Sequence, residues 1–194
     1  MEPRNAVAHD INPVFASRWS PYAFDPKRDV SEGDLQAIFE AARWTMSAFN
    51  AQPWRYIVGV QGRGQETWDD VFNSLLAGNQ GWTRNVPVLA LGLVQPNFEY
   101  NGKPNGTALH DLGAASAALT FEATSRGLVV HQMSGIDPAR ARELFDIDEA
   151  YRPVTALAIG YASQSAETDD EFAQRDQRPR ERKPLEELIL RGGF

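Results

Sequence analysis

Residues 107–126 read TALHDLGAASAALTFEATSR and form the longest helical pattern in the chain. Gly127 follows directly and suits the position just after a helix C-terminus, which commonly adopts a left-handed conformation. A helix with such small side chains packs closely, so we expect it either at the centre of the domain or against a second copy of the chain. Its small or apolar residues lie on more than one side: Leu109, Leu112, Gly113, Ala114, Ala115, Ala117, Ala118, Leu119 and Phe121.

Helix and strand patterns alternate on both sides of this segment. Upstream, the patterns predict a helix over 32–45, a strand over 55–60, a helix over 68–76 ended by Gly78-Asn79, and a buried strand over 86–94. Downstream, they predict a strand over 128–131, a short helix opened by Asp137-Pro138, and a strand over 154–161. The alternation favours an α/β or α+β sandwich over an all-helical bundle.

The two ends of the chain differ from this core in composition. Residues 1–30 contain four prolines, which excludes a long regular element, and we treat 1–16 as an N-terminal extension. The segment 163–179 begins with acidic residues and is typical of a solvated linker. Residues 180–194 combine arginines with Leu185, Leu188 and Ile189, which predicts a terminal helix that docks. With no internal repeat, residues 1–194 read as a single domain.

Composition excludes several classes of function. The 194 residues contain no cysteine, so disulfides, thiolate metal sites and a cysteine nucleophile are excluded. The three histidines share no ligand spacing, so we expect no metal, and His110 reads as a packing residue. A net charge of −7 argues against nucleic-acid binding. With no signal-peptide pattern and no membrane-length apolar run, we expect a cytoplasmic protein that does not contact membranes.

The first polar cluster is Arg18-Trp19-Ser20, followed by Tyr22. In an extended segment, residues two apart point the same way, so Arg18 and Ser20 together suit a phosphate monoester. Arginine beside serine is also common on ordinary surfaces, and the cluster alone does not distinguish these readings.

The second polar cluster lies between a helix and a strand, where residues 46–54 read MSAFNAQPW. Ser47, Asn50 and Gln52 could bond the edge of a planar heterocycle, with aromatic residues on both sides. The alternative is a helix-to-strand connection whose polar side chains satisfy its own backbone.

In this order and spacing, the motifs resemble those of the FMN-dependent nitroreductase superfamily. Arg18-Trp19-Ser20 is similar to its N-terminal Arg-x-Ser motif, and 46–54 is similar to its Pro-Ser-x-x-Asn-x-Gln-Pro-Trp loop. Residues 111–127 resemble its long central helix and Gln132-Met133-Ser134-Gly135 its flavin-contacting turn. The stretches 159–161 and 180–185 resemble its closing strand and C-terminal basic motif.

The resemblance implies a fold, an assembly and a cofactor. The fold would be a mixed or antiparallel sheet flanked by helices, and the assembly an intertwined homodimer with FMN at its interface. Hydride would pass from NADH or NADPH through FMN to a nitroaromatic, quinone, enone or free flavin by a ping-pong mechanism. Because the cofactor carries the electrons, the protein itself would supply no catalytic acid of the usual kind.

The resemblance also implies a role for each matching residue. Arg18, Ser20, Arg180 and Arg182 would hold the FMN phosphate, because arginine offers charge and donors in a fixed fork. Backbone N–H groups of Ser134 and Gly135 would face the flavin N5. The full set of implied cofactor-binding residues is Arg18, Trp19, Ser20, Tyr22, Ser47, Asn50, Gln52, Gln132, Met133, Ser134, Gly135, Arg180 and Arg182.

One departure from the family pattern leaves alternatives open. Tyr22 stands where the family commonly has a basic residue near the ring's N1 and O2 edge, and Arg84 is a possible substitute. The tyrosine favours a second reading, a flavin-binding protein that senses, stores or delivers FMN without turnover. A third reading is an interaction protein that has lost its cofactor, against which the retained polar set counts. Trp82, Phe98 and Tyr100 are candidates to stack on an aromatic acceptor.

Overall fold

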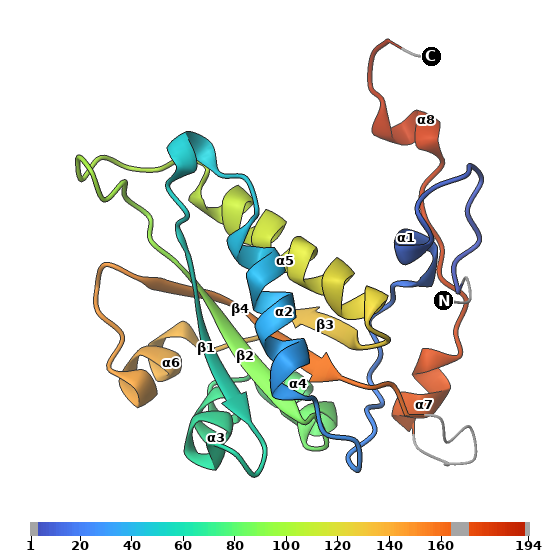
Figure 1. Ribbon diagram of the computed structural model, residues 1–194, viewed down its shortest axis with the longest axis horizontal. Helices are drawn as coiled ribbons and strands as arrows, with labels where there is room; N and C mark the ends of the chain where they lie inside the picture. The colour runs from blue at the N-terminus through green and yellow to red at the C-terminus, as the bar shows by residue number, and fades with distance from the viewer. Residues whose placement is uncertain (1–3, 164–170, 193–194) are drawn as a thin grey trace.

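The computed structural model describes residues 4–163 and 171–192 (Figure 1). Its helices and strands follow in the order α1 (Pro13–Ser17), α2 (Glu32–Arg43), the 3₁₀ turn η1 (Ala48–Asn50), β1 (Trp54–Val60), α3 (Gln65–Asn73), α4 (Ala77–Thr83), β2 (Val88–Val94), α5 (Ala108–Ser125), β3 (Val129–Met133), α6 (Pro138–Phe145), β4 (Arg152–Gly160), α7 (Glu171–Asp176) and α8 (Leu185–Leu188).

The strands form one antiparallel sheet of order β1-β2-β4-β3. Strand β2 is buried at every position, as its uninterrupted apolar sequence requires of a central strand. Segment 23–25 extends the sheet's end by bonding to 161–163 beyond β4. The predicted α+β sandwich is confirmed, with an antiparallel sheet.

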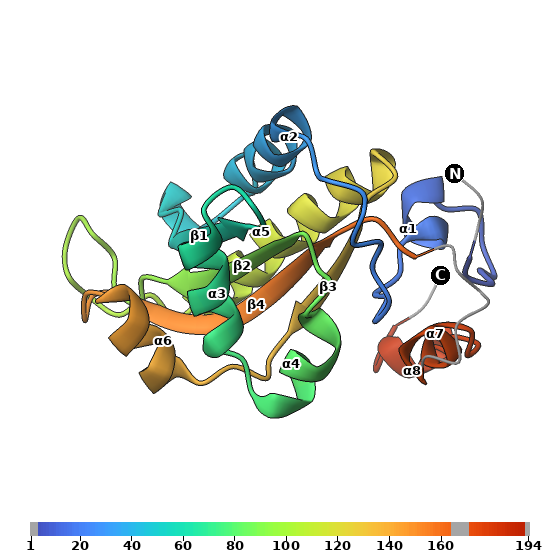
Figure 2. The ribbon, with the colours of Figure 1, turned by 90° about the horizontal axis from the view of Figure 1, so that it is seen from below.

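Two layers of helices cover the sheet, as Figure 2 shows edge-on, with α2 and α5 on one face and α3, α4 and α6 on the other. Along β3 the side chains alternate between these layers, because successive residues of a strand point to opposite faces. Val130 packs in the core beneath α5, whereas Val129 and Met133 pack in the core beneath α3, α4 and α6. The same alternation places Gln132 on the α5 side of the sheet and Met133 on the opposite side.

Helix α5 is held on the sheet by a buried stripe at helical spacing, including Leu112, Ala115 and Leu119, which are at most 2% exposed. Gly127 follows the helix with φ +77°, the left-handed conformation predicted for it. On the outward side, Gly113 is exposed and Ala114, Ala117 and Ala118 are half-buried. One face of α5 therefore belongs to the core, while its small-residue face remains uncovered in the single chain.

Two sequence predictions need correction. The helix over 68–76 does not end at Gly78-Asn79: α3 ends at Asn73, and α4 runs through both residues. The predicted linker over 163–179 contains helix α7, which is anchored because the Asp176 carboxylate accepts hydrogen bonds from the N–H groups of Tyr22 and Ala23 at 2.9–3.0 Å. Residues 164–170 of that segment lie outside the described residues.

The C-terminal arm, residues 180–192, extends away from the body (Figure 1). Helix α8 buries none of its residues, and Leu188 and Leu190 are 66% and 95% exposed. Within residues 4–163 and 171–192, the predicted docking of this terminal helix is therefore not observed. Among the described residues, no helix is both long and apolar enough to cross a membrane.

Gly59 of β1 tests the packing of α3 on the sheet. A Cβ at this position would lie 2.4 Å from the backbone N and Cα of Trp68, so the backbone of β1 or α3 would have to shift. We expect Gly59→Ala to lower the free energy of unfolding in urea by about 1–3 kcal/mol or more.

Gly78→Ala, placed in a helix with no atom within 4 Å, is the matched control. It should be neutral or stabilising by up to about 1 kcal/mol. Equal effects of the two substitutions would contradict this account.

Candidate functional site

Arg18, Ser20 and Gln132 line one cavity of about 290 Å³ on the α5 side of the sheet. Arg18 Nη1 donates to Ser20 Oγ at 3.1 Å, so the two side chains point the same way, as the spacing predicted. The remaining walls come from α5 and β3, through Ala117, Thr120, Phe121 and Val130. This volume is at the lower limit of ligand pockets, which commonly span about 300–1,000 Å³.

Arg180 and Arg182, from the C-terminal stretch, approach Arg18, which lines this cavity. Arg180 Nη1 donates to the backbone oxygen of Arg18 at 2.7 Å, across 162 residues of sequence. Burial, followed by the charges of Arg18, Arg182 and Arg4, lowers the pKa of Arg180 to about 10. Burial and the charge of Arg182 likewise lower the pKa of Arg18. Since neighbouring cations lower each other's pKa, the cluster has positive charge that an anion would neutralise.

Arg4 belongs to this arginine cluster, although no sequence motif pointed to it. Its guanidinium stacks over the Trp19 ring at 3.4 Å and donates to the backbone oxygen of Asp176. Burial lowers the pKa of Arg4, and the nearby Asp176 carboxylate partly opposes that effect. Arg4 lies in the segment read as an N-terminal extension, where an isolated arginine gives no pattern to recognise.

The side chain of Gln132 is held by α5. Its Nε2 donates to the Ser116 backbone oxygen at 3.1 Å and to Thr120 Oγ1 at 3.0 Å. Both donors of the amide are thereby used, and its Oε1 is the atom left to accept a hydrogen bond from a ligand.

The turn after β3 presents backbone donors. Within the described residues, the N–H groups of Ser134 and Gly135 donate no hydrogen bond, whereas the Gly135 oxygen accepts from Leu76 N and Asn79 Nδ2. A Cβ on Gly135 would lie 2.6 Å from Asn79 Nδ2, so glycine fits the close approach of α4. Asn79 was not predicted from sequence, since nothing in a Gly-Asn pair marks it as a contact of this turn.

The loop holding Ser47, Asn50 and Gln52 is organised mainly by its own hydrogen bonds. Ser47 Oγ accepts from the Gln52 N–H at 3.0 Å, and Gln52 Nε2 donates to the Asn50 backbone oxygen at 2.9 Å. The loop lies against the N-terminal end of α5, where the Asp111 carboxylate accepts from the Ala48 N–H at 3.3 Å. Hydrogen bonding within the loop and binding of a ligand, the two interpretations of this motif, both fit this geometry.

The predicted residues thus form two groups within one chain. Arg18, Ser20 and Gln132 lie beside the middle and C-terminal part of α5, and the 47–52 loop lies at its N-terminal end. No residue of that loop lines the cavity that holds Arg18, Ser20 and Gln132.

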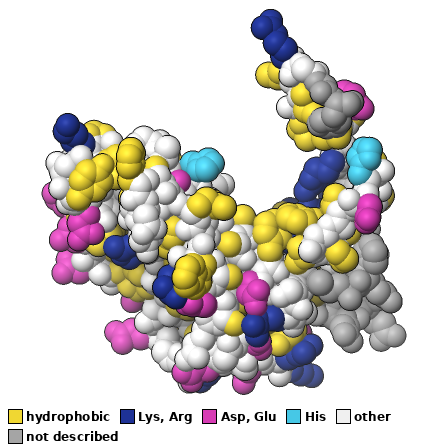
Figure 3. Space-filling model, turned by 45° about the horizontal axis from the view of Figure 1, so that its top comes forward, with side chains coloured by type: hydrophobic (Ala, Val, Ile, Leu, Met, Phe, Trp, Pro, Cys, Tyr) yellow, Lys and Arg dark blue, Asp and Glu magenta, His cyan; other side chains and the backbone are white. Residues whose placement is uncertain are grey.

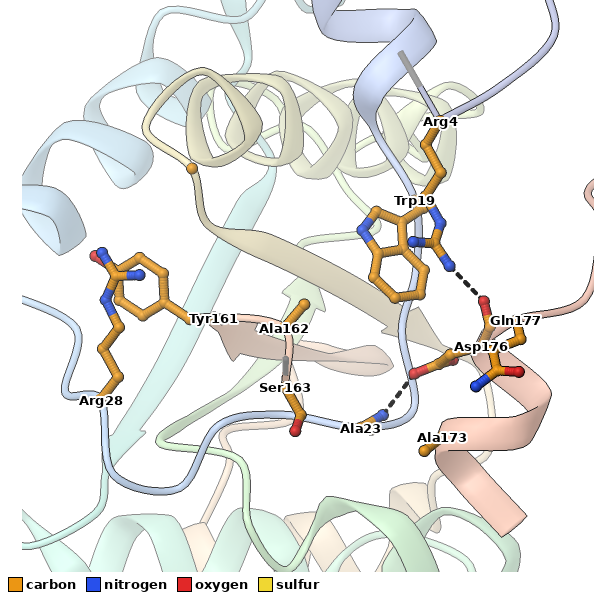
Figure 4. A pocket seen from close by; sticks show the side chains of 11 residues that line it. Arg4, Trp19, Ala23, Arg28, Tyr161, Ala162, Ser163, Ala173, Asp176 and Gln177 are labelled. Atoms are coloured by element: carbon orange, nitrogen blue, oxygen red, sulfur yellow. Dashed lines mark hydrogen bonds between the residues drawn. The ribbon is translucent and has the colours of Figure 1, made fainter. Parts of the chain in front are cut away.

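The side chains of three further predicted residues point elsewhere. Trp19 faces a separate cavity of about 440 Å³, shown in Figure 4, where Arg28 also stacks on Tyr161 at 3.4 Å. Tyr22 packs edge-on against Trp82 and His131, with ring centroids 5.3 and 4.8 Å apart. Met133 is 4% exposed and packs in the opposite core. Trp19 also lines, together with Arg18, a smaller cavity of about 220 Å³. From its position Met133 could offer a ligand in the cavity of Arg18, Ser20 and Gln132 only its backbone groups.

Three other sequence-derived candidates are redefined by the structure. Arg84 stacks over Phe72 at 5.4 Å and shares a cavity with Tyr22 but not with Arg18. Trp82 is 5% exposed and too buried to stack on an acceptor. His110 is not a packing residue, because its side chain is 81% exposed and its Nδ1 lies 3.3 Å from Asp111 Oδ1. Residues 4–163 and 171–192 contain no group of acidic residues or histidines able to hold a metal ion.

Comparison with known proteins identifies the family. The nitroreductase family model matches residues 15–161. The major NAD(P)H-flavin oxidoreductase of Aliivibrio fischeri is 26% identical over 232 residues, covering 94% of this chain and 97% of that protein. An uncharacterized 15.4 kDa protein of Mycolicibacterium smegmatis is 37% identical over 142 residues, covering 71% and 95%.

The fold comparison agrees with the sequence comparison. A crystal structure described as an oxidoreductase containing FMN matches with a TM-score of 0.88 at 31% identity, covering 100% of this chain and 98% of that one. The fold is the one that nitroreductases share. The chain belongs to the nitroreductase family.

His131 predicts a loss of stability in acid. Burial lowers its pKa below the usual 6.5, against the opposing effects of the Pro21 oxygen at 2.7 Å and of Asp176; the Arg175 and Arg18 charges lower it further. The unfolded chain then binds the extra proton more readily, so stability contributed by neutral His131 is present above about pH 6.5 and is lost as pH falls through the lower folded pKa.

We expect the melting temperature of the wild type to fall between pH 7 and pH 5, and His131→Gln to show a shallower fall. His9→Gln, an exposed histidine substitution, should retain the wild-type slope. The same slope in wild type and His131→Gln would rule out His131 as its source.

Proposed function

We propose that this protein is an FMN-dependent oxidoreductase that transfers hydride from NADH or NADPH to a nitroaromatic, quinone, enone or free flavin in ping-pong turnover. The observation that carries the proposal is the convergence of Arg18, Arg180 and Arg182. In the described part of the chain, none of these three arginines forms an ion pair with a carboxylate. Such a cluster suits a phosphate dianion.

The other cofactor contacts follow from the same geometry. Ser20 adds a hydroxyl beside Arg18, and Gln132 Oε1 and the free N–H groups of Ser134 and Gly135 would bond the flavin ring. FMN, when bound, supplies the two-electron chemistry that links donor and acceptor. The protein's part is to bind the phosphate, orient the ring and leave one face open.

A second copy of the chain would complete the site. Ser47, Asn50 and Gln52 lie outside the cavity of Arg18 in their own chain, so we propose that they serve the cavity of the partner copy. The uncovered small-residue face of α5 and the unburied α8 offer the contact surfaces. Figure 3 shows the hollow between the body and the C-terminal arm that a second copy would fill.

The alternative, flavin binding without turnover, is favoured by one observation. Tyr22 replaces the cation common in the family, and its ring packs edge-on against both Trp82 and His131. Against it, the Arg175 guanidinium lies 3.8 Å from the Tyr22 ring centroid and brings a positive charge to the same place.

The purified protein should show a flavin absorption spectrum that bleaches on anaerobic addition of NADH or NADPH. Bleaching follows from a bound ring with one accessible face, and the faster donor identifies the preferred nicotinamide. A flavin spectrum that persists would instead support the non-catalytic flavin-binding protein. A colourless protein that does not bind added FMN would refute both readings.

Mixing two defective variants tests the shared site. Arg18→Ala/Arg182→Ala and Asn50→Ala/Gln52→Ala should each bind FMN at least about tenfold more weakly, because charged and neutral hydrogen bonds are lost. In a mixed dimer, one of the two sites would combine intact arginines with an intact loop. We therefore expect unfolding and refolding the variants together to restore one tight FMN site per mixed dimer, measured by fluorescence titration.

Arg178→Ala, an exposed arginine in the same C-terminal stretch, is the control and should bind FMN like the wild type. No restored binding in mixed dimers whose formation is verified by mass would place both groups in the site of one chain.

A further inference from the structure

The 47–52 loop holds an unusual concentration of backbone strain. Phe49, Asn50 and Gln52 have φ of +53°, +55° and +47°, a region that residues other than glycine rarely adopt. Each such residue raises the energy of the folded loop, and asparagine tolerates the conformation better than phenylalanine does. The Phe49 side chain is 82% exposed, so burial in its own chain offsets little of that cost.

Most contacts that stabilise this conformation are local. Within the loop, Ser47 Oγ and the Asn50 backbone oxygen both accept hydrogen bonds from Gln52. Arg55, at the start of β1, donates from Nη1 to the Gln52 backbone oxygen at 2.9 Å. In the described chain, the only hydrogen bond from residues 47–52 to a residue distant in sequence is from the Ala48 N–H to Asp111 Oδ2. This bond attaches the strained loop to α5.

The Asp111 carboxylate is itself held in place by its surroundings. Its side chain is 5% exposed, and it lies in the first turn of α5, where the helix dipole favours a negative charge. Thr107 Oγ1 lies 3.3 Å from Asp111 Oδ2 and 2.8 Å from Asn105 Oδ1, so its proton can serve either acceptor. Asn105 is itself buried and accepts from the Thr107 N–H, which fixes the start of the helix.

We infer that Asp111 is a positioning residue for flavin binding: through the Ala48 N–H it holds Ser47, Asn50 and Gln52 in the strained, binding-competent conformation. This inference rests on the proposed function for its consequence, since the loop is the part that would bond the flavin. It does not rest on that function for the tether, which exists in the chain without a ligand. Asp111 acts through the loop and touches no reacting atom.

Removing the acceptor should loosen the loop before it affects the fold. In Asp111→Ala without flavin, we expect hydrogen exchange of the Ala48 and Gln52 amides to become about tenfold faster or more, the scale of a lost charge-assisted hydrogen bond. Exchange at Leu91 in the central strand should remain unchanged. The dissociation constant for FMN should rise by a similar factor, while the absorption maximum of bound flavin stays near that of the wild type.

The conservative variant separates positioning from general stability. Asp111→Asn keeps an oxygen acceptor in place, so it should recover most of the loop protection and FMN affinity that Asp111→Ala loses. Thr124→Ala removes a buried, hydrogen-bonded hydroxyl group from the opposite end of α5 and should change neither loop protection nor FMN affinity. If Asp111→Ala does not fold, Asp111→Asn decides the matter, because weakening the charged bond should still accelerate exchange at Ala48 by a few-fold.

The outcomes distinguish the tether from the proposed function. A wild type that does not bind FMN refutes the function, while hydrogen exchange at Ala48 still tests the tether. Unchanged exchange at Ala48 in the Asp111 variants overturns the tether. Faster exchange with wild-type FMN affinity overturns the positioning role and leaves the flavin function standing.

Discussion

The packing of α5 on the sheet is the interaction on which the rest of the structure depends. Its buried stripe packs on the core of the sheet, and the helix positions both Gln132 and the 47–52 loop. Ser116 and Thr120 hold Gln132 from the middle of the helix, whereas Asp111 holds the 47–52 loop from its first turn. A shift of α5 along the sheet would therefore displace both groups of site residues at once.

The elements that build this frame could be predicted from sequence because their information is local. Helical spacing, a left-handed glycine and an uninterrupted apolar strand identified α5, Gly127 and β2. The prediction that Gly78-Asn79 ends a helix was wrong, although such a pair commonly does so. Here Asn79 lies inside α4, and its Nδ2 donates to the Gly135 backbone oxygen. That contact spans 56 residues, and no local pattern records it.

The candidate site was predictable only where a short motif has a fixed geometry. The hydrogen bond between Arg18 and Ser20 follows from two residues on one side of an extended segment. The meeting of Arg18 with Arg180 is a property of the tertiary fold, and family resemblance alone pointed to it. Arg4 and Asp111 were missed because their residue types, an arginine near a chain end and an acid in a first helical turn, are ordinary in those positions.

The exposed C-terminal arm couples binding of the cofactor to association of two chains. Leu188 and Leu190 are solvent-exposed in a single chain, and Arg180 and Arg182 lie at the base of the same arm. With a second copy as the cover, association of the chains and retention of the anionic cofactor strengthen each other by the same factor. Dilution would then release flavin as well as separate the subunits, and the protein's colour would report its own concentration.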